Sequence, residues 1–510
     1  MDPARNEYDA VVVGGGHNGL TAAAYLARAG LSVLVLERLD HTGGAAVARY
    51  SGLVSLLPAG IVDDLGLDIE LRSRPTASYT PVLRDGTPGG LYIEREEGEA
   101  TRQSFRELTG SDVEYDAWRE FHADVAGLAH VVSPTLIAPL PLERDVRERI
   151  DKGVWRDLVE QPLGRTLEER FSDDTVRGVV ASNALLGTFV SLHDTSLVQN
   201  RCFLYHLVRH DTGGWQVPVG GMDAVAAALA RSATEAGAEV VTGAGVSGIS
   251  AGDDGAEVTW HDGSTAHTVA ARFVLANVAP WVLHILMGEP DDAENKPEGA
   301  QLNISFLLDR LPRLKSGMDP EIAFAGTLHL GEDYSRLQAA YADAAAGRVP
   351  AAMPGEAYCH SLTDPSILGD APEGTHTLTY FGLHTPASLF DRDPGAKELA
   401  VRRAIASLDE HLVEPLIDCV AREADGRPRI EATIPQDVEH DLAMPGGHIF
   451  HGHLDWPWAS NRSRLETPAQ QWGVQTDVAT VLLCGSGARR GGAVSAIGGH
   501  NAAQAVLAMR

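Results

Sequence analysis

The chain has 510 residues, of which 44% are hydrophobic and 22% are charged, and it is too long for one simple domain. Its 41 Lys and Arg residues against 70 Asp and Glu residues give a formal net charge of −29. This charge argues against nucleic acid, which needs a basic stripe that the sequence does not show, and against docking on anionic lipid, which needs clustered Lys and Arg. No stretch is apolar for the roughly 18 residues that a membrane span needs. Too few residues precede Tyr8 for a targeting peptide. We therefore expect a cytoplasmic protein with no integral membrane segment and no nucleic-acid partner.

The four cysteines are far apart in the sequence and form no C-x-x-C pair: Cys202, Cys359, Cys419 and Cys484. This spacing argues against a redox-active disulfide of the adjacent kind and against a thiolate zinc site. We expect buried free thiols.

The N-terminal stretch predicts a β-α-β unit. The run "DAVVVGGG" is apolar without alternation, which is typical of a strand buried on both faces. An Ala-rich helix follows over residues 19–30, with Gly30 as its stop signal. The run "LSVLVLER" is a second buried strand that ends at Glu37, and the whole unit has the length of a parallel crossover.

A G-x-G-x-x-G motif lies between the first strand and the helix, formed by Gly14, Gly16 and Gly19 with His17 and Asn18 between them. The first glycine allows a tight turn, the second lets a pyrophosphate approach the backbone, and the third lets helix and strand pack closely. The helix N-terminus then offers N–H groups to the phosphates. Together with its flanking strand and helix, the motif predicts dinucleotide binding.

The residues after the second strand favour FAD over NAD. Glu37 is placed for the ribose hydroxyls and disfavours a 2′-phosphate. Glu37 and Arg38 begin an E-R-x-x-x-x-G-G pattern that ends at Gly43 and Gly44 and continues into Ala45. FAD proteins of the glutathione-reductase type carry this pattern, and NAD-only dehydrogenases lack it.

The predicted secondary structure changes three times after this β-α-β unit. From about residue 101 to 210 the apolar positions have helical spacing, as in "YDAWREFHADVAGLAHVV". Alternating helix and strand are predicted again from "GGMDAVAAALARSATEAG", a helix, and "ARFVLANVAP", a buried strand. Residues 300–472 mix strands with helices and suit an α+β domain.

The C-terminus repeats the pattern of strand, glycine turn and helix in "TVLLCGSGARRGGAVSAIGGHNAAQAVL". Such a unit suits the last element of an FAD domain, where the helix N-terminus stabilises negative charge on the reduced flavin ring. The cofactor residues expected here are Gly485, Gly491, Gly492 and Val494. The alternative is a plain core helix. Arg489 and Arg490, in the turn, would face the flavin or a substrate carboxylate, or pair with surface acids.

The chain as a whole resembles the phytoene dehydrogenase-like FAD flavoproteins, and among them the branch named pyridine nucleotide-disulfide oxidoreductase domain-containing protein 2. The strings that carry the resemblance include "SLVQNRCFLYHLV", "WQVPVGGMDAV", "YCHSLTDPSILG" and "GGHIFHGHLDWPW". Despite the branch's name, the cysteine spacing predicts no dithiol chemistry.

The resemblance implies an α/β fold with a split Rossmann-like FAD domain of the glutathione-reductase type. That domain is expected to comprise residues 1–100, 214–299 and 473–510. Residues 101–213 and 300–472 are expected to form an inserted α+β substrate domain with a helical segment. The resemblance also places Val246 where family members touch the adenine. The loop after Gly44 is shorter than is usual in the family, which predicts an altered pocket.

The candidate catalytic residues are histidines. The stretch "HIFHGHLDWPW" is expected to line the pocket by the flavin, and within it His451 is the candidate for the base that takes a proton. His360, in the turn "CHSLTDPS", is the second candidate. The competing interpretation of both is structural hydrogen bonding. We predict no metal, because no Asp, Glu or Cys ligand set accompanies His448, His451 and His453.

These observations predict an FAD-dependent oxidoreductase that desaturates or oxidises a small or medium organic substrate at a C–C or C–heteroatom bond. Oxygen or a quinone-like acceptor would reoxidise the flavin. The alternatives are a redox-neutral isomerase or saturase that uses reduced FAD, and a flavin-holding scaffold without turnover. The sequence names neither the substrate nor the oligomeric state.

Overall fold

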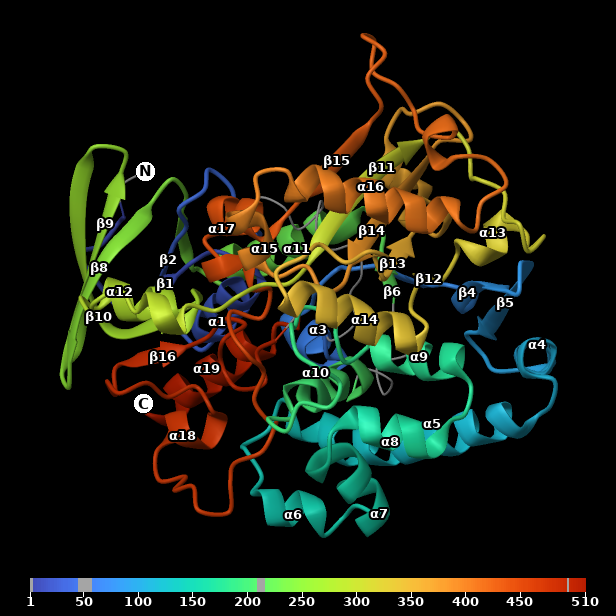
Figure 1. Cartoon of the computed structure of the whole chain (residues 1–510). Helices are drawn as coiled ribbons and strands as arrows, with labels where there is room; N and C mark the ends of the chain where they lie inside the picture. Colours follow the sequence, from blue (N-terminus) through green and yellow to red (C-terminus); the bar gives the residue numbers. More distant parts are fainter. Residues whose placement is uncertain (1–2, 45–56, 209–215, 493–494) are drawn as a thin grey trace.

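The computed structural model of the chain describes residues 3–44, 57–208, 216–492 and 495–510. Two seven-stranded sheets carry most of the fold, and a group of helices lies below them in Figure 1. The first sheet has a parallel part whose strands, in spatial order, are β7 (Glu239–Val241), β2 (Val33–Leu36), β1 (Glu7–Val13), β10 (Thr265–Ala276) and β16 (Val481–Leu483). The antiparallel strands β9 (Gly255–Asp262) and β8 (Gly245–Gly252) extend it beyond β10.

Strand β10 joins the parallel and antiparallel parts of this sheet. Its first half pairs with β9, and its second half pairs with β1 on one side and β16 on the other. Three distant parts of the sequence therefore meet in one sheet. Their Val- and Leu-rich runs are buried on both faces, as the sequence predicts for parallel strands.

Helices cover one face of the parallel part, and β8 and β9 cover the other. The helices are α1 (His17–Arg28), α11 (Gly221–Glu235) and α19 (Ile497–Ala508). In both views α1 (blue) lies beside the C-terminal α19 (red). The approach is close, because a β-carbon placed on Gly499 would lie 1.9 Å from the Asn18 carbonyl oxygen. Val12 packs on the helical side and Val13 packs on the other.

The second sheet has the strand order β15-β11-β14-β13-β12-β4-β5, and its neighbours are antiparallel except for β12 and β4. Its strands are β4 (Thr76–Arg84), β5 (Thr87–Glu94), β11 (Leu302–Leu308), β12 (Thr327–Leu330), β13 (Gly355–Tyr358), β14 (His376–Gly382) and β15 (Ile430–Thr433). Strands β4 and β5 lie inside segment 1–100, yet they hydrogen-bond into this second sheet. Strands β3 (Leu71–Ser73) and β6 (Gln216–Pro218) form a separate two-stranded antiparallel sheet, which joins the N-terminal part of the chain to the segment before α11.

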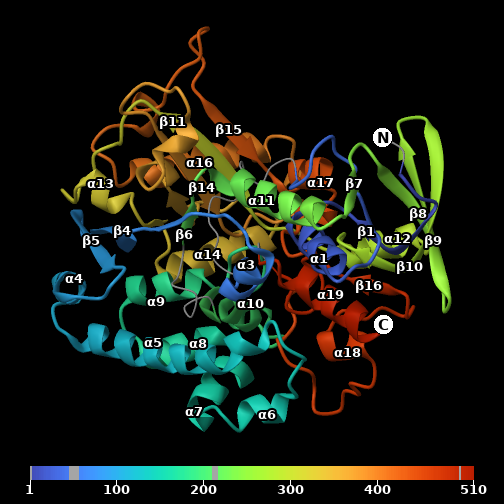
Figure 2. The ribbon, with the colours of Figure 1, turned by 180° about the vertical axis from the view of Figure 1, so that it is seen from behind.

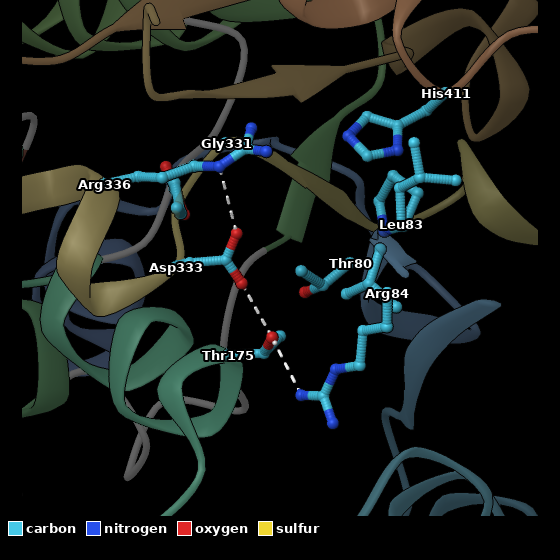
Figure 3. Close-up of a pocket in the computed structure, with 11 residues that line it drawn as sticks. Thr80, Leu83, Arg84, Thr175, Gly331, Asp333, Arg336 and His411 are labelled. Carbon is cyan, nitrogen blue, oxygen red and sulfur yellow. Dashed lines mark hydrogen bonds and ion pairs between the residues drawn. The ribbon is translucent and has the colours of Figure 1, made fainter. Parts of the chain in front are cut away.

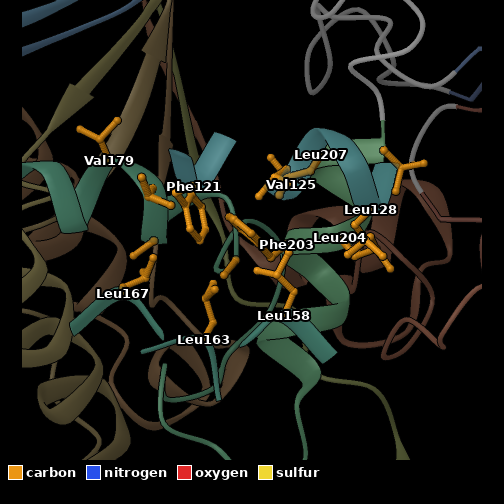
Figure 4. Packing of buried hydrophobic residues seen from close by; sticks show 14 of the residues in the cluster. Phe121, Val125, Leu128, Leu158, Leu163, Leu167, Val179, Phe203, Leu204 and Leu207 are labelled. Atoms are coloured by element: carbon orange, nitrogen blue, oxygen red, sulfur yellow. The ribbon is translucent and has the colours of Figure 1, made fainter. Parts of the chain in front are cut away.

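The chain from residue 99 to residue 207 is helical, as the spacing of its apolar residues predicts. Its helices are α4 (Glu99–Thr109), α5 (Val113–Val132), α6 (Glu143–Arg147), α7 (Lys152–Trp155), α8 (Leu163–Arg170), α9 (Asp174–Ser182) and α10 (Val198–Leu207). Their buried faces share one core, in which Phe121, Leu163 and Phe203 face one another (Figure 4). No helix in the described part of the chain is long and apolar enough to cross a membrane.

Three further helices pack against the first sheet or its helices: α3 (Ala59–Leu65), α12 (Pro280–Leu286) and α18 (Pro468–Trp472). The other helices lie in the part of the chain that forms the second sheet: α13 (Pro320–Ala323), α14 (Tyr334–Ala345), α15 (Ala387–Arg392), α16 (Ala396–Asp409) and α17 (Pro435–Leu442). All four cysteines are free and buried, as predicted.

Candidate functional site

The opening glycine turn lies between β1 and α1, where the sequence places it. Gly14 has a φ of +101°, a backbone conformation that favours glycine. A β-carbon on Gly19 would lie 2.1 Å from the Gly14 carbonyl oxygen. This oxygen belongs to the backbone, so it cannot move aside without opening the turn. A β-carbon on Gly16 would crowd the Asn277 side-chain amide at 3.1 Å. The three glycines of the motif therefore keep the turn tight and its surface free of side chains.

Glu37 is buried beside this turn, with 8% of its surface exposed. One carboxylate oxygen accepts a hydrogen bond from the Gly15 N–H at 2.7 Å, and the other accepts one from the Leu39 N–H at 2.8 Å. The Gly43 N–H donates to the Gly15 carbonyl at 3.0 Å. The turn, the acid and the first glycine of the G-G pair are thus one hydrogen-bonded unit.

Other predicted cofactor residues lie at the edge of this unit or outside the described residues. The Arg38 guanidinium is exposed and donates to the Asp441 carbonyl at 2.7 Å. Val246 lies on β8 opposite Trp260, next to a register shift in the β8–β9 ladder. Gly44 has a φ of +85°. Ala45, Val494 and most of the short loop after Gly44 are outside the described residues.

Asn277 joins the opening turn to the closing turn, and sequence reasoning missed it. It directly follows β10, its side-chain amide donates to the Gly14 carbonyl at 3.0 Å, and its backbone N–H donates to the Val13 carbonyl. A β-carbon on Gly485 would lie 3.1 Å from the other amide atom of Asn277, Oδ1. The available signal was an asparagine at the carboxyl end of a buried parallel strand, which is the edge where ligands of such sheets bind.

The closing glycines are packed against backbone, as a turn that precedes a tightly docked helix requires. A β-carbon on Gly491 would lie 2.3 Å from the Gly485 carbonyl oxygen, and one on Gly498 would lie 2.7 Å from the same atom. A β-carbon on Gly492 would contact the Leu454 side chain at 2.4 Å. The turn after β16 therefore lies against both the N-terminus of α19 and the histidine-rich stretch.

Of the two arginines of the closing turn, Arg490 departs from the sequence expectation and Arg489 follows one of its alternatives. Arg490 is buried and donates to the carbonyls of Thr135, Ala138 and Trp472, so its hydrogen bonds hold backbone rather than a carboxylate. Burial lowers the pKa of Arg490 to about 10. Arg489 makes the expected surface ion pair with an acidic residue, Asp455, at 3.4 Å.

His451 lies next to both glycine turns. Its backbone has a φ of +63°, and a β-carbon on Gly487 in the closing turn would lie 3.4 Å from the His451 β-carbon. Burial, with a smaller contribution from His17 in the opening turn, lowers the pKa of His451 to about 4. Its Nδ1 is buried without a hydrogen-bond partner among the described residues. His451 is therefore a neutral imidazole at pH 7 with a free ring nitrogen.

His448 and His453 continue this histidine stretch. The ring centroids of His448 and His453 are 5.8 Å apart. His448 is 1% exposed, and burial, together with the neighbouring histidines, lowers its pKa to about 3. Its Nδ1 accepts a hydrogen bond from the Phe450 N–H at 3.2 Å. The pKa values of His448 and His451 are shifted by burial and by other histidines, and no carboxylate among the described residues contributes to either shift.

His360 lies elsewhere, after β13, with its ring stacked on Tyr358 at a centroid distance of 5.9 Å. Burial and the nearby Arg74 lower its pKa to about 3. Asp364, in the same turn, accepts hydrogen bonds from the backbone N–H groups of Ser366 and Gly220. Among the described residues, no hydrogen bond or ring contact joins His360 to His451.

The residues of the opening turn fit the pyrophosphate and ribose of a dinucleotide. Helix α1 begins after Gly16 without a side-chain cap, so its first N–H groups remain available to an anion. The Asn18 side chain is 1% exposed, and both of its polar atoms lack a hydrogen-bond partner among the described residues. Unsatisfied buried groups of this kind require an explanation, and a bound polar ligand supplies one.

Comparison with known proteins gives the class. Residues 19–305, more than half of the chain, match the family of flavin containing amine oxidoreductases, and the chain belongs to this family. It is an FAD-dependent oxidoreductase by that membership, and FAD is its cofactor.

The relatives agree with the phytoene dehydrogenase-like resemblance. The chain is 48% identical over its whole length to Rv0897c, an uncharacterized protein of Mycobacterium tuberculosis, of which the match covers 98%. It is 28% identical over 98% of its length to 93% of the rat pyridine nucleotide-disulfide oxidoreductase domain-containing protein 2. It is also 25% identical, over 83% of its length, to 69% of the chloroplastic prolycopene isomerase of Daucus carota.

The fold is also that of solved amine oxidases. Putrescine oxidase bound to putrescine superposes with a TM-score of 0.56 at 18% identity, covering 98% of this chain and 97% of that one. At this identity the likeness concerns the fold alone.

Proposed function

We propose that this chain is a phytoene desaturase-like dehydrogenase or oxidase that removes two hydrogens from an uncharged organic substrate at a C–C or C–heteroatom bond. The observation that carries this proposal is that His451, which lies beside both glycine turns, and His448 in the same stretch are neutral. His448 and His451 have pKa values of about 3 and 4, so they add no charge at neutral pH. A buried ammonium substrate would need a paired carboxylate, and none perturbs these two histidines.

The proposal assigns the two ends of FAD to the two glycine turns. Gly14, Gly16 and the N-terminus of α1 would hold the pyrophosphate, and Glu37 would accept hydrogen bonds from the ribose. The turn after β16 and the N-terminus of α19 would face the flavin ring, where the positive end of the helix favours negative charge. Five parallel strands continued by antiparallel β9 and β8 support the glutathione-reductase subtype of the domain.

The remaining cofactor residues of the proposal are those that flank the two turns. His17 and Asn18 would lie under the phosphates, Arg38 and Val246 beside the adenosine, and Gly43 and Gly44 at the entry of the chain beneath the pyrophosphate. On the flavin side the proposal places Gly485, Gly491 and Gly492. The domain division at 1–100, 214–299 and 473–510 against 101–213 and 300–472 is part of the same proposal. The end of its first segment is best moved from residue 100 to a point before β4, because β4 and β5 pair with the second sheet.

When bound, FAD supplies the two-electron acceptor of the reaction. In this step the protein orients the substrate and receives a proton. The unpartnered Nδ1 of His451 accepts a hydrogen bond or the proton that leaves the substrate. His360 is the weaker candidate, because the Arg74 guanidinium disfavours its protonation.

A redox-neutral isomerase is the second candidate, and the match to prolycopene isomerase over most of the chain favours it. The two reactions differ in whether the substrate reduces the flavin in each turnover. We propose oxygen or a quinone-like compound as the acceptor for the first, whereas the second needs reduced FAD throughout.

Anaerobic mixing of the oxidised holoprotein with candidate substrates tests the proposal. We expect an uncharged polyene that still has saturated C–C bonds to bleach the flavin absorbance, and we expect putrescine and cyclohexylamine to leave it unchanged. Bleaching by the amines alone would overturn the proposal of an uncharged substrate. Conversion of the polyene only by the photoreduced holoprotein, without net flavin oxidation, would favour the isomerase. Photoreduced flavin that stays reduced for minutes in air would count against oxygen as the acceptor.

A further inference from the structure

Three ionisable side chains converge inside the second sheet, away from both glycine turns. His329 is on β12, Glu332 follows it by three residues, and Glu356 is on β13 directly opposite His329 in the antiparallel register. One ligand atom from each residue lies within 4.8 Å of the other two. We call these three residues the His329 cluster.

The His329 cluster is buried and incompletely hydrogen-bonded. His329, Glu332 and Glu356 are 5%, 1% and 2% exposed. His329 Nδ1 lies 2.6 Å from Glu332 Oε2 and 3.7 Å from Glu356 Oε1. The other carboxylate oxygen of Glu332, Oε1, has no hydrogen-bond partner among the described residues. A buried carboxylate oxygen left in this way is costly, so the site calls for a further positive group.

The neighbouring cation, Arg74, supplies one positive charge for the two carboxylates. Arg74 is buried and lies over the Tyr358 ring at 5.9 Å, and its guanidinium donates to the Thr327 hydroxyl at 3.5 Å. The Tyr358 hydroxyl separates it from the cluster by donating to Glu356. Arg74 can therefore balance the charge of one carboxylate, which leaves the second to be balanced by a proton or by a bound cation.

We propose that His329, Glu332 and Glu356 bind one divalent transition-metal ion. One imidazole nitrogen with two carboxylate oxygens is a ligand set that suits Zn²⁺, Mn²⁺ or Fe²⁺. Ligand atoms at about 2.0–2.2 Å from Zn²⁺ lie roughly 3 to 3.5 Å from one another, and the two measured separations bracket that spacing.

The turn that carries Glu332 also lines a cavity and is hydrogen-bonded to a neighbouring helix. A cavity of about 40 Å³ is lined by Glu332 together with Thr80, Asp333 and Arg336, and Figure 3 shows Asp333 joined to Thr175 on one side and Arg336 on the other. The Asp333 carboxylate accepts a hydrogen bond from the Thr175 hydroxyl of α9 at 2.7 Å.

Helix α9 also packs directly on the turn that carries Glu332. A β-carbon on Gly178 would lie 1.7 Å from the Glu332 carbonyl oxygen. An ion held by Glu332 and by the two strands would therefore fix the helical segment against the second sheet. Its role in this proposal is structural.

Metal content of the purified, untagged holoprotein tests this proposal. The protein is dialysed against chelator, loaded separately with ZnCl₂ and MnCl₂, freed of excess metal, and analysed by mass spectrometry. We expect about one ion per chain. We also expect loss of the free Mn²⁺ electron paramagnetic resonance signal on titration, and a higher melting temperature in the loaded protein than after chelation. The His329→Asn/Glu356→Gln double variant should retain less than a tenth of the metal.

The matched control is a surface histidine–glutamate pair, His193 with Glu168, whose side chains are 43% and 42% exposed. The His193→Asn/Glu168→Gln variant should bind metal as the wild type does. If the double variant of the cluster does not fold, the wild-type measurement decides. Failure of the wild type to retain either ion, with a melting temperature that neither metal nor chelator changes, would show that the cluster shares protons instead. Equal metal uptake by wild type and a folded double variant would place the ion elsewhere and also overturn the proposal. None of these results depends on flavin turnover, so failure here leaves the proposed function untouched.

Discussion

The Asn277 side-chain amide donates a hydrogen bond to the Gly14 carbonyl oxygen at 3.0 Å, across 263 residues of sequence. The same amide lies against Gly485, the first glycine after β16. One side chain at the end of β10 therefore sets the distance between the opening turn and the closing turn. If those turns hold the two ends of FAD, as we propose, Asn277 controls the cofactor site without being part of either glycine motif.

Replacing Asn277 by alanine should weaken FAD binding and lower stability. The change leaves the Gly14 carbonyl without its partner, at a cost of about 1–3 kcal/mol. Thermal melting of the apoprotein and FAD titration measure the two effects separately. Asn461→Ala is the control, because the Asn461 side chain accepts one exposed backbone hydrogen bond, from Arg144, far from the turns. Equal behaviour of the two variants would contradict this role of Asn277.

Gly19→Ala and Gly127→Ala should change stability in opposite directions. A β-carbon on Gly19 would lie 2.1 Å from a backbone oxygen, so the opening turn must open, and we expect loss of FAD and a destabilised fold. A β-carbon on Gly127, within helix α5, meets no atom within 4 Å. That substitution should stabilise the protein by up to about 1 kcal/mol through helix propensity. Melting temperatures of the two variants check the pair, and an undisturbed Gly19→Ala protein would refute the close approach.

Glu37→Gln should weaken FAD affinity by about tenfold to a hundredfold, because the charged partner of the ribose hydroxyls is lost. Titration of apoprotein with FAD, followed by flavin fluorescence, measures the change. Glu235→Gln, at the exposed end of α11, removes the same charge from the same domain and should leave the affinity unaltered. Retention of FAD by Glu37→Gln at the wild-type level would undercut the assignment of Glu37 to the ribose.

Acidification should destabilise the protein through its buried histidines, and His448 is the clearest case. Burial lowers its pKa from about 6.5 in the unfolded chain to about 3 in the folded chain. The unfolded state therefore binds more protons between these values, so stability is complete above about pH 6.5 and falls as the pH drops towards 3. From pH 7 to pH 5 this one group should cost about 2 kcal/mol.

The variant His448→Asn should reduce that loss, because asparagine does not titrate and its side-chain oxygen can replace Nδ1 as acceptor for the Phe450 N–H. Urea unfolding of the holoprotein at the two pH values measures the difference. The same substitution at the exposed His193, His193→Asn, serves as the control for replacing a histidine by asparagine at the surface. A His448→Asn protein with the wild-type pH dependence would show that His448 already titrates normally.

Local sequence patterns predicted the first sheet and its turns well. The run from Asp9 to Val13 and the run from Val33 to Leu36 are strands, and the helix between them begins at His17. These elements depend on apolar continuity and glycine placement within a few residues, which a sequence displays directly. The helical character of residues 101–207 is visible in the sequence for the same reason.

Relationships between distant residues were not predictable in this way. Asn277 follows a strand whose neighbours β1 and β16 are far away in sequence, so its contact with Gly14 has no local signal. The His329 cluster depends on the register that places Glu356 opposite His329, and the prediction of no metal considered only histidines within one stretch. Arg490 was expected to meet a charged group, yet the closing turn directs it at three backbone carbonyls.

An experimental structure of the FAD-reconstituted chain tests the central claim most directly. We predict density for one FAD per chain, with the Glu37 carboxylate within hydrogen-bonding distance of the ribose hydroxyls, the flavin ring at the turn before α19, and His451 beside it. FAD density in that orientation would confirm that Asn277 links the two halves of one site. A flavin ring bound away from the closing turn, with His448 and His451 packed in a closed core, would contradict the account.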